Sequence, residues 1–109
     1  MFDGVYNNSE YWINGKKLGY HLSGYAPFYF DVTDYLNPNE DNRMTVRVDH
    51  SHYADSRWYT GSGIYRDVKM IVTDRLHIPV WGTFVTTPVV TDKYAKVNNQ
   101  ITVRNSYSE

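Results

Sequence analysis

The stretch "SRWYTGSGIYRDVKMIV", residues 56–72, decides how the whole chain is interpreted. An arginine and two aromatic residues, Arg57, Trp58 and Tyr59, stand directly before a glycine-rich bend at residues 61–63, and an apolar alternation follows. The two glycines of the bend permit a kink where a strand begins. The cluster before the bend either lines a ligand pocket or closes the end of a sheet, and the surrounding sequence has to decide between these roles.

Upstream of this stretch, alternating apolar and polar residues predict strands. Residues 9–22, "SEYWINGKKLGYHL", hold two short runs joined by Asn14-Gly15, a dipeptide that favours the type I′ turn of a β-hairpin. Residues 43–50, "RMTVRVDH", alternate cleanly, and the apolar face of this predicted strand consists of Met44, Val46 and Val48. Nowhere does an apolar stripe of helical period extend over ten residues. The sequence therefore predicts an all-β chain, with a sandwich as the expected architecture.

Two further segments are predicted to be extended. In "YAPFYFDVTDYL", residues 25–36, Phe28 and Phe30 should lie on one face and Tyr29 on the other, before a turn capped by Asp and Thr side chains at residues 31–34. "IYRDVKMIV", residues 64–72, is predicted to be a strand whose apolar members are Ile64, Val68, Met70 and Val72.

Composition narrows the class of partner. The 109 residues are 41% apolar, enough for one modest core, and carry a net charge of -1 with acidic and basic residues interspersed. A net charge this close to zero provides no basic surface for binding nucleic acid or an anionic membrane. No apolar run reaches the roughly 20 residues that span a bilayer. Without cysteine there is no disulfide, thiolate nucleophile or sulfur ligand for zinc. The compartment stays open between periplasmic or secreted and cytoplasmic.

The character of the sequence changes near residue 75. Residues 76–90, "LHIPVWGTFVTTPVV", contain two prolines that suit an edge strand or an interdomain crossing, and residues 92–109 offer one more hairpin-like pair. A sandwich commonly needs about seven strands, more than either part supplies. We therefore expect two incomplete domains, whose exposed strand edges should drive the chain to form a dimer, a strand-swapped oligomer or an aggregate.

Several strings together closely resemble glycoside hydrolase family 2, in its β-galactosidase branch: "FDGVYNNSEYWINGKKLGYHLSGYAPFYFDVTDYL", "NRMTVRVDHS", "SRWYTGSGIYRDV" and "WGTFVTTP". The resemblance implies a jelly-roll sugar-binding domain, then an immunoglobulin-like sandwich, then a catalytic TIM barrel. On this map, residues 1–74 are the C-terminal part of the jelly roll. Residues 75–109 are the N-terminal part of the immunoglobulin-like domain, and the TIM barrel lies outside this chain.

The resemblance assigns no catalytic residue to this chain. Retaining glycosidases need two carboxylates about 5 Å apart, and in the family both are glutamates on barrel strands. Glu10, Glu40 and Glu109 lie instead in a predicted hairpin strand, a loop and a terminus, and no cofactor is expected. The parent protein is thus expected to be a retaining β-galactosidase-type hydrolase that acts on a glycoside or oligosaccharide, whereas this fragment should be inactive alone.

The resemblance also implies that the loop before the Ser-Gly-Ile strand reaches the barrel mouth and helps to close the substrate pocket. Better-known family members have an aspartate five residues before the position of Ser62, where this chain has Arg57. A guanidinium donates hydrogen bonds but accepts none, so Arg57 either binds sugar hydroxyls or an acidic substituent, or pairs with a barrel aspartate. Trp58 and Tyr59 either stack on a sugar ring or seal the contact with the barrel. These three residues are the predicted substrate-binding pocket edge.

Other polar residues receive simpler interpretations. Arg66 is expected to make a structural contact with a carboxylate or with backbone carbonyls. His50 and His52 would share one face of a strand with Asp55 nearby, but a metal centre needs a third convergent ligand, so no metal site is predicted. Two other functions remain open beside the leading one: an autonomous carbohydrate-binding module, and a sandwich that only scaffolds neighbouring domains.

Overall fold

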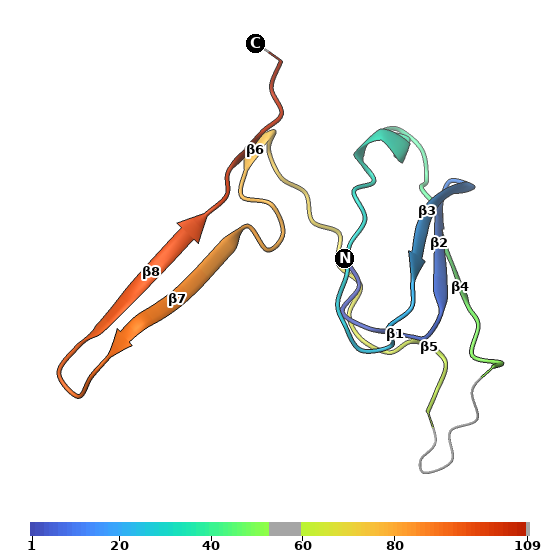
Figure 1. Cartoon of the computed structure of the whole chain (residues 1–109). Coiled ribbons are helices and arrows are strands. Elements are labelled where there is room, and N and C mark those ends of the chain that lie inside the picture. The colour runs from blue at the N-terminus through green and yellow to red at the C-terminus, as the bar shows by residue number, and fades with distance from the viewer. Residues whose placement is uncertain (53–59, 109) are drawn as a thin grey trace. The chain divides into compact units, whose positions relative to one another are not determined.

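The computed structural model describes residues 1–52 and 60–108, which form two compact units, Met1–Met70 and Ile71–Glu109. Figure 1 labels the strands from β1 to β8, and each unit is described by itself below. Apart from one 3-10 turn, every regular element in the described residues is a strand, so the prediction of an all-β chain is confirmed. No helix within residues 1–52 and 60–108 has the length and apolar character needed to cross a membrane.

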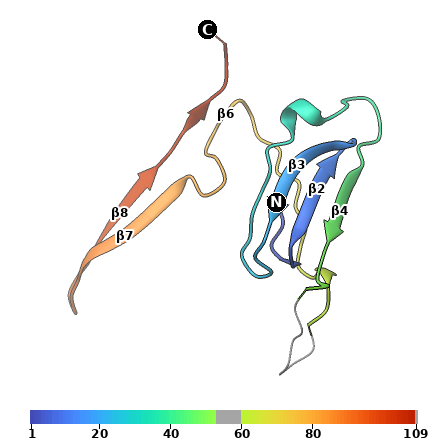
Figure 2. The same cartoon turned by 45° about the vertical axis from the view of Figure 1, so that its right-hand side comes forward.

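A three-stranded antiparallel sheet with the order β3-β2-β4 dominates the first unit (Figure 2). Its strands are β2 (Ser9–Ile13), β3 (Lys16–His21) and β4 (Met44–Val48). The turn between β2 and β3 has positive φ at both Asn14 (50°) and Gly15 (79°), as a type I′ turn requires, so the predicted hairpin is confirmed. The Asn14 side chain also ties this turn to β4, because its Oδ1 accepts a 2.9 Å hydrogen bond from the Arg43 amide.

The remaining elements of the first unit are short. Strand β1 (Val5–Tyr6) pairs with β5 (Gly63–Ile64), and η1 (Thr33–Tyr35) is the 3-10 turn. Residues 25–36 make only an isolated bridge between Phe28 and Phe2, so the strand predicted there is wrong in extent. Its predicted facing is confirmed, because Phe28 is buried and Tyr29 is 43% exposed. The predicted capped turn is also confirmed, since Asp31 Oδ1 accepts hydrogen bonds from the amide and hydroxyl of Thr33.

The core of the first unit is largely aromatic. Tyr11 is fully buried, and its ring lies 4.9 Å from Phe2, 5.1 Å from Phe28 and 5.1 Å from Phe30, measured between centroids. Its hydroxyl donates a 2.6 Å hydrogen bond to the buried Ser9 Oγ, so the polar end of the ring is satisfied within the core. The partly buried hydrophobic residues packed against this cluster are Leu18, Phe30, Val46 and Val48.

The strand predicted over residues 64–72 is wrong in extent. Only Gly63–Ile64 is a strand there, paired with β1. Beyond it, residues 65–69 run beside residues 1–4 through an isolated bridge between Val68 and Phe2 and backbone hydrogen bonds. The predicted apolar members of this strand are exposed: Ile64 by 50%, Val68 by 53%, Met70 by 71% and Val72 by 80%. Within residues 1–52 and 60–108, these apolar side chains are left uncovered.

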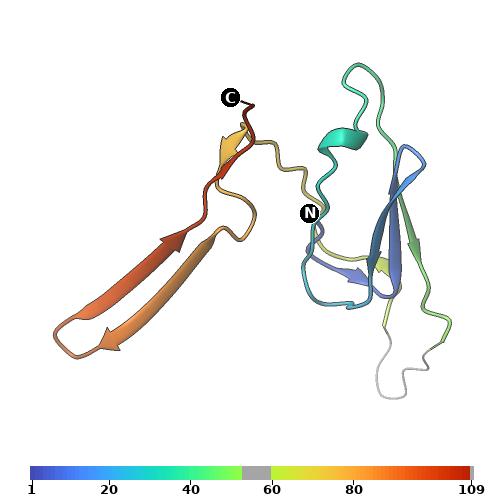
Figure 3. The same ribbon diagram turned by 45° about the horizontal axis from the view of Figure 1, so that its top comes forward.

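The second unit consists of two antiparallel pairs, with β7 and β8 forming the long ribbon seen in Figure 3. Strand β7 (Thr83–Val90) pairs with β8 (Ala95–Ile101), and β6 (Leu76–His77) pairs with β9 (Arg104–Asn105). The hairpin predicted within residues 92–109 is therefore wrong, because the 95–101 strand pairs backward with β7. Pro88 falls where the ladder register shifts, between Thr86 and Val89, which fits a residue that cannot donate a backbone hydrogen bond.

Both faces of the β7–β8 ribbon are exposed. Its exposed apolar side chains include Phe84, Val85, Val90 and Val97. An isolated two-stranded ribbon is marginally stable in water, so these faces are suited to being covered by further structure. The dimer or strand-swapped oligomer expected from the sequence stays a prediction.

Candidate functional site

The three predicted pocket-edge residues, Arg57, Trp58 and Tyr59, lie outside the described residues, so their placement stays a prediction. The structure does describe residues on both sides of them. His50 Nδ1 lies 2.9 Å from Ser62 Oγ, and the Tyr6 ring stands edge-on to the His50 ring with centroids 5.0 Å apart. Residues that follow β4 and precede β5 are thus held together by a hydrogen bond.

Gly63 in the bend and Arg66 just after β5 have the conformation and the contact that the sequence predicts for them. Gly63 has φ of 110°, a conformation that residues with a side chain rarely adopt, which explains the glycine there. Arg66 donates a 3.3 Å hydrogen bond to the carbonyl of Tyr25, and its guanidinium lies 5.1 Å from the centroid of the Tyr65 ring. The prediction that Arg66 contacts a backbone carbonyl is therefore confirmed.

Within residues 1–52 and 60–108, no group of three or more His, Cys, Asp or Glu side chains is placed where it could hold a metal ion. His50 points to Ser62, and Asp55, which was considered beside it, lies outside the described residues.

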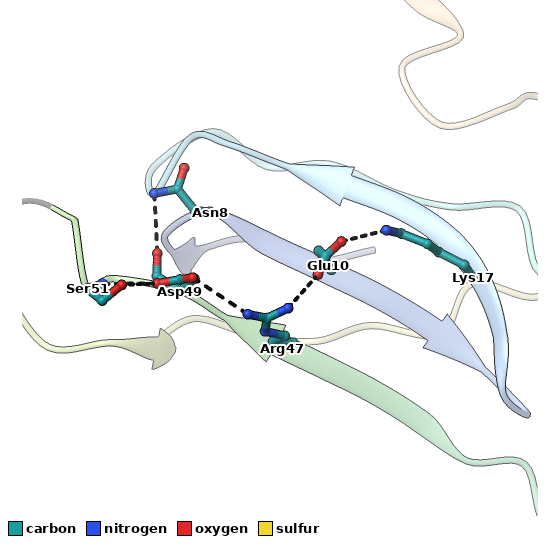
Figure 4. Close-up of polar contacts among 6 residues, drawn as sticks. All are labelled: Asn8, Glu10, Lys17, Arg47, Asp49 and Ser51. Atoms are coloured by element: carbon teal, nitrogen blue, oxygen red, sulfur yellow. Dashed lines mark hydrogen bonds and ion pairs between the residues drawn. The ribbon is translucent and has the colours of Figure 1, made fainter.

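A continuous polar network covers the outward face of the β3-β2-β4 sheet (Figure 4). Arg47 on β4 lies between two carboxylates, with its guanidinium 3.4 Å from Glu10 and 3.7 Å from Asp49. Glu10 on β2 also accepts a hydrogen bond from Lys17 on β3. Asp49 accepts hydrogen bonds of 3.1 Å and 2.6 Å from the amide and hydroxyl of Ser51. The network thus links all three strands of the sheet.

These contacts favour the ionised form of both carboxyl groups and lower the pKa of each. The hydrogen bond from Lys17 is the largest cause that lowers the pKa of Glu10 from its ordinary value of 4.5. For Asp49, the hydrogen bonds from Ser51 are the largest causes that lower the pKa from 3.8. At neutral pH the face therefore carries two cations, Lys17 and Arg47, and two anions, Glu10 and Asp49, so its charges balance.

The lowered pKa of Glu10 makes the stability of the chain depend on pH. A carboxyl whose pKa is lower in the folded state stabilises that state above its unfolded value, and the contribution is lost as pH falls through the folded value. The free energy of unfolding should therefore decrease as pH falls below 4.5, only modestly because the ion pairs are exposed. Urea unfolding at a series of pH values measures how steeply the free energy of unfolding depends on pH. This dependence should be weaker in Glu10→Gln but not in the control Glu40→Gln, which lies in the exposed loop before β4. An unchanged pH dependence in Glu10→Gln would contradict the assignment.

A groove of about 260 Å³ opens on the same face. Its lining residues are Asn8, Ser9, Glu10, Tyr20, Leu22, Arg47 and Asp49. Sequence reasoning placed Glu10 on a hairpin strand but gave it no part in a site, and it did not single out Tyr20 or Arg47. The alternation within each strand does indicate that these side chains share a face, but only the pairing of β2 with β4 brings Arg47 beside Glu10.

Comparison with known proteins identifies the chain. Residues 1–74 match the model of "Glycosyl hydrolases family 2, sugar binding domain". The chain belongs to glycosyl hydrolase family 2. This family 2 chain is 48% identical to the β-galactosidase BoGH2A of Bacteroides ovatus over 104 residues, which are 95% of the chain and 12% of that protein. Other family 2 relatives are named as β-galactosidases and β-glucuronidases.

Two solved structures superpose closely on the chain. A β-glycosidase from Bacteroides vulgatus superposes with a TM-score of 0.84 at 40% identity, over 99% of this chain and 14% of that structure. A family 2 member from Bacteroides cellulosilyticus gives a TM-score of 0.82 at 42% identity, over 96% of this chain and 14% of that structure. The family 2 chain thus spans a small part of the length of each relative.

Proposed function

We propose that this chain is a non-catalytic accessory region of a longer, retaining family 2 glycosidase of the β-galactosidase or β-glucuronidase type. The observation that supports this most directly is the likeness of nearly the whole chain to about an eighth of much longer β-galactosidases and β-glycosidases. The catalytic carboxylates of such an enzyme would come from a TIM barrel outside this chain. The Glu10 carboxylate is already paired with Lys17 and Arg47 on an exposed face of the sheet.

Two domains divide the chain in this proposal. Residues 1–74 form the C-terminal part of a jelly-roll sugar-binding domain, and residues 75–109 form the first strands of an immunoglobulin-like sandwich. The family match ends at residue 74, close to the boundary between the compact units after Met70. The second unit contains only strands among its described elements and exposes apolar residues on both faces of its ribbon, which fits an opening portion of a sandwich.

Within the longer enzyme, Arg57, Trp58 and Tyr59 contribute an edge of the substrate pocket. The hydrogen bond between His50 and Ser62 supports this role, because it fixes described residues on both sides of the segment in one place. A guanidinium is suited to sugar hydroxyls or to an acidic substituent, and two aromatic rings are suited to the apolar face of a sugar.

Expression of the chain alone and of a longer protein that adds a barrel tests the proposal. The longer protein should hydrolyse a nitrophenyl galactoside or a nitrophenyl glucuronide with retention of the anomeric configuration, and the chain alone should hydrolyse neither. Hydrolysis by the chain alone would contradict the proposal. So would a longer protein that folds but cleaves neither glycoside, an outcome that would favour a purely scaffolding role.

A further inference from the structure

The turn between β2 and β3 contains Asn14-Gly15, a pair of residues that can react with each other without an enzyme. The Gly15 backbone nitrogen gives up its proton to solvent and attacks Asn14 Cγ. A bond forms between that nitrogen and Cγ, the bond from Cγ to Nδ2 breaks, and the departing NH2 group takes up a proton and leaves as ammonia. Water then opens the cyclic imide to aspartate or isoaspartate. Glycine assists because no side chain obstructs its nitrogen, and asparagine is accordingly a thermolabile residue.

Three hydrogen bonds hold the Asn14 side chain in the folded chain. Its Oδ1 accepts a 2.9 Å hydrogen bond from the Arg43 amide. Its Nδ2 donates hydrogen bonds of 2.9 Å to the carbonyl of Tyr35 and 2.8 Å to Asn42 Oδ1. The side-chain NH2 group has only two hydrogens to donate, so both are used. Asn14 thereby ties the β2–β3 turn to the end of η1 and to the start of β4, which lie at the same end of the sheet (Figure 2).

The Asn42 side chain, which accepts one of these bonds, is itself fully engaged. Its Oδ1 also accepts a 2.8 Å hydrogen bond from the Asn37 amide. Its Nδ2 donates hydrogen bonds of 2.9 Å to the carbonyl of Asn37 and 3.1 Å to that of Glu40. We call the carboxamides of Asn14 and Asn42, together with the groups they bond, the asparagine lock. All of its members lie among the described residues of the first unit.

The asparagine lock opposes the reaction of Asn14 with Gly15. Ring closure must bring Asn14 Cγ within a bond length of the Gly15 nitrogen, and this movement pulls Oδ1 and Nδ2 away from their partners. It also requires the backbone of both residues to move, but the turn fixes them at φ of 50° and 79°. The reaction is therefore confined to molecules in which the lock has opened, and its rate falls with the fraction of such molecules.

We propose that Asn14 is a deamidation site that the asparagine lock keeps unreactive until the first unit opens. The change is then self-reinforcing. A carboxylate at position 14 donates no hydrogen bonds, and it would face two acceptors, the Tyr35 carbonyl and Asn42 Oδ1. A chain modified while open therefore cannot re-form the lock. The inference goes beyond the proposed function, because it concerns a covalent change at a turn and not the binding of a ligand.

Peptide mapping by mass spectrometry tests the site in the whole 109-residue chain, kept in mildly alkaline buffer with and without guanidinium chloride. A synthetic peptide of residues 11–18 gives the intrinsic rate. In denaturant, Asn14 should gain the mass of OH in place of NH2 at the rate of the synthetic peptide. In buffer alone the gain should be slower by about tenfold or more. Equal rates in buffer and denaturant would overturn the proposal, as would an Asn14 that stays unmodified in denaturant.

Variants at position 42 separate the lock from general protection by folding. Asn42→Ala should speed the modification in buffer and leave the rate in denaturant unchanged, because the sequence around Asn14 is the same. Asn42→Asp keeps an acceptor for Asn14 Nδ2 and should retain part of the protection. Asn39→Ala, an exposed position of the same loop outside the lock, is the matched control and should change neither rate.

Two outcomes with these variants would overturn the role of the lock. One is an unchanged rate in buffer for Asn42→Ala, and the other is an equal acceleration by Asn39→Ala, which would indicate a general loss of stability. Asn14→Asp, which places the product side chain in the turn, should lower the denaturant concentration at the unfolding midpoint. An unchanged midpoint would contradict the self-reinforcing step. All of these readouts are independent of glycoside hydrolysis by the longer enzyme.

Discussion

Replacement of Tyr11 by alanine is expected to abolish the cooperative unfolding of the first unit. Tyr11 is fully buried, and its ring contacts the rings of Phe2, Phe28 and Phe30. Truncating a large buried aromatic side chain costs about 3–5 kcal/mol, which removes most of the stability of a small unit at the lower end of the usual range of about 5–15 kcal/mol. Urea denaturation followed by tyrosine and tryptophan fluorescence should show no transition, and amide NMR signals should lose their dispersion.

Tyr11→Phe is the matched variant, because it retains the ring and removes only the hydroxyl. That hydroxyl donates to Ser9 Oγ, which in turn donates a 3.1 Å hydrogen bond to the carbonyl of His21. Loss of the first hydrogen bond should cost about 1 kcal/mol and leave a cooperative transition. If Tyr11→Ala unfolded at nearly the same urea concentration as Tyr11→Phe, the aromatic cluster would not be the stabilising core.

The second large effect is expected for Arg57→Ala in the longer enzyme. A hydrogen bond that involves a charged group is worth about 1.5–3 kcal/mol, so kcat/KM should fall about ten- to a hundredfold. Arg57→Lys should recover part of the loss, because it restores the charge but not the planar fork of donors. Arg43→Ala is a suitable control for the lost charge, since Arg43 is exposed beside β4.

The same variants separate recognition of an acidic substituent from the other roles left open for Arg57. If the guanidinium binds an acidic substituent of the substrate, Arg57→Ala should lower turnover of a glucuronide more than that of a galactoside, because only the glucuronide carries a carboxylate. If Arg57 binds hydroxyls that both sugars carry, or pairs with an aspartate of the barrel, both substrates should lose turnover to a similar degree. Unchanged turnover with both substrates would remove the pocket role and favour scaffolding.

Local sequence predicted the parts of the fold that depend on local interactions. Asn14-Gly15 predicts its turn because few other dipeptides adopt positive φ twice in succession, and Asp31 predicts a turn because its side chain reaches the Thr33 amide. The alternation over residues 43–50 predicts β4, and the lack of a helical stripe predicts the all-β class. The structure agrees at each of these points.

Strand pairing was the part that local sequence could not decide. The alternation in "IYRDVKMIV" predicted a full strand, yet the regular pairing of β5 with β1 ends at Ile64, and residues 65–69 make only irregular backbone contacts with residues 1–4. Likewise, the 95–101 segment could have paired forward within residues 92–109 but pairs with β7 instead. Several distant segments can compete to pair with one strand, and the residue pattern within that strand does not show which of them pairs with it.

The sequence by itself determined the chemistry available to this protein: turn residues, an all-β pattern, no cysteine and a family 2 resemblance that the comparison with known proteins confirmed. Only the tertiary structure decided which side chains meet. Tyr20, Glu10 and Arg47 are separated along the chain and unremarkable in sequence, but the register of β3, β2 and β4 sets them in one row beside a groove. The physical reason is that residue type and turn propensity are local properties, whereas a binding surface on a sheet exists only once non-local hydrogen-bonded ladders have set its register.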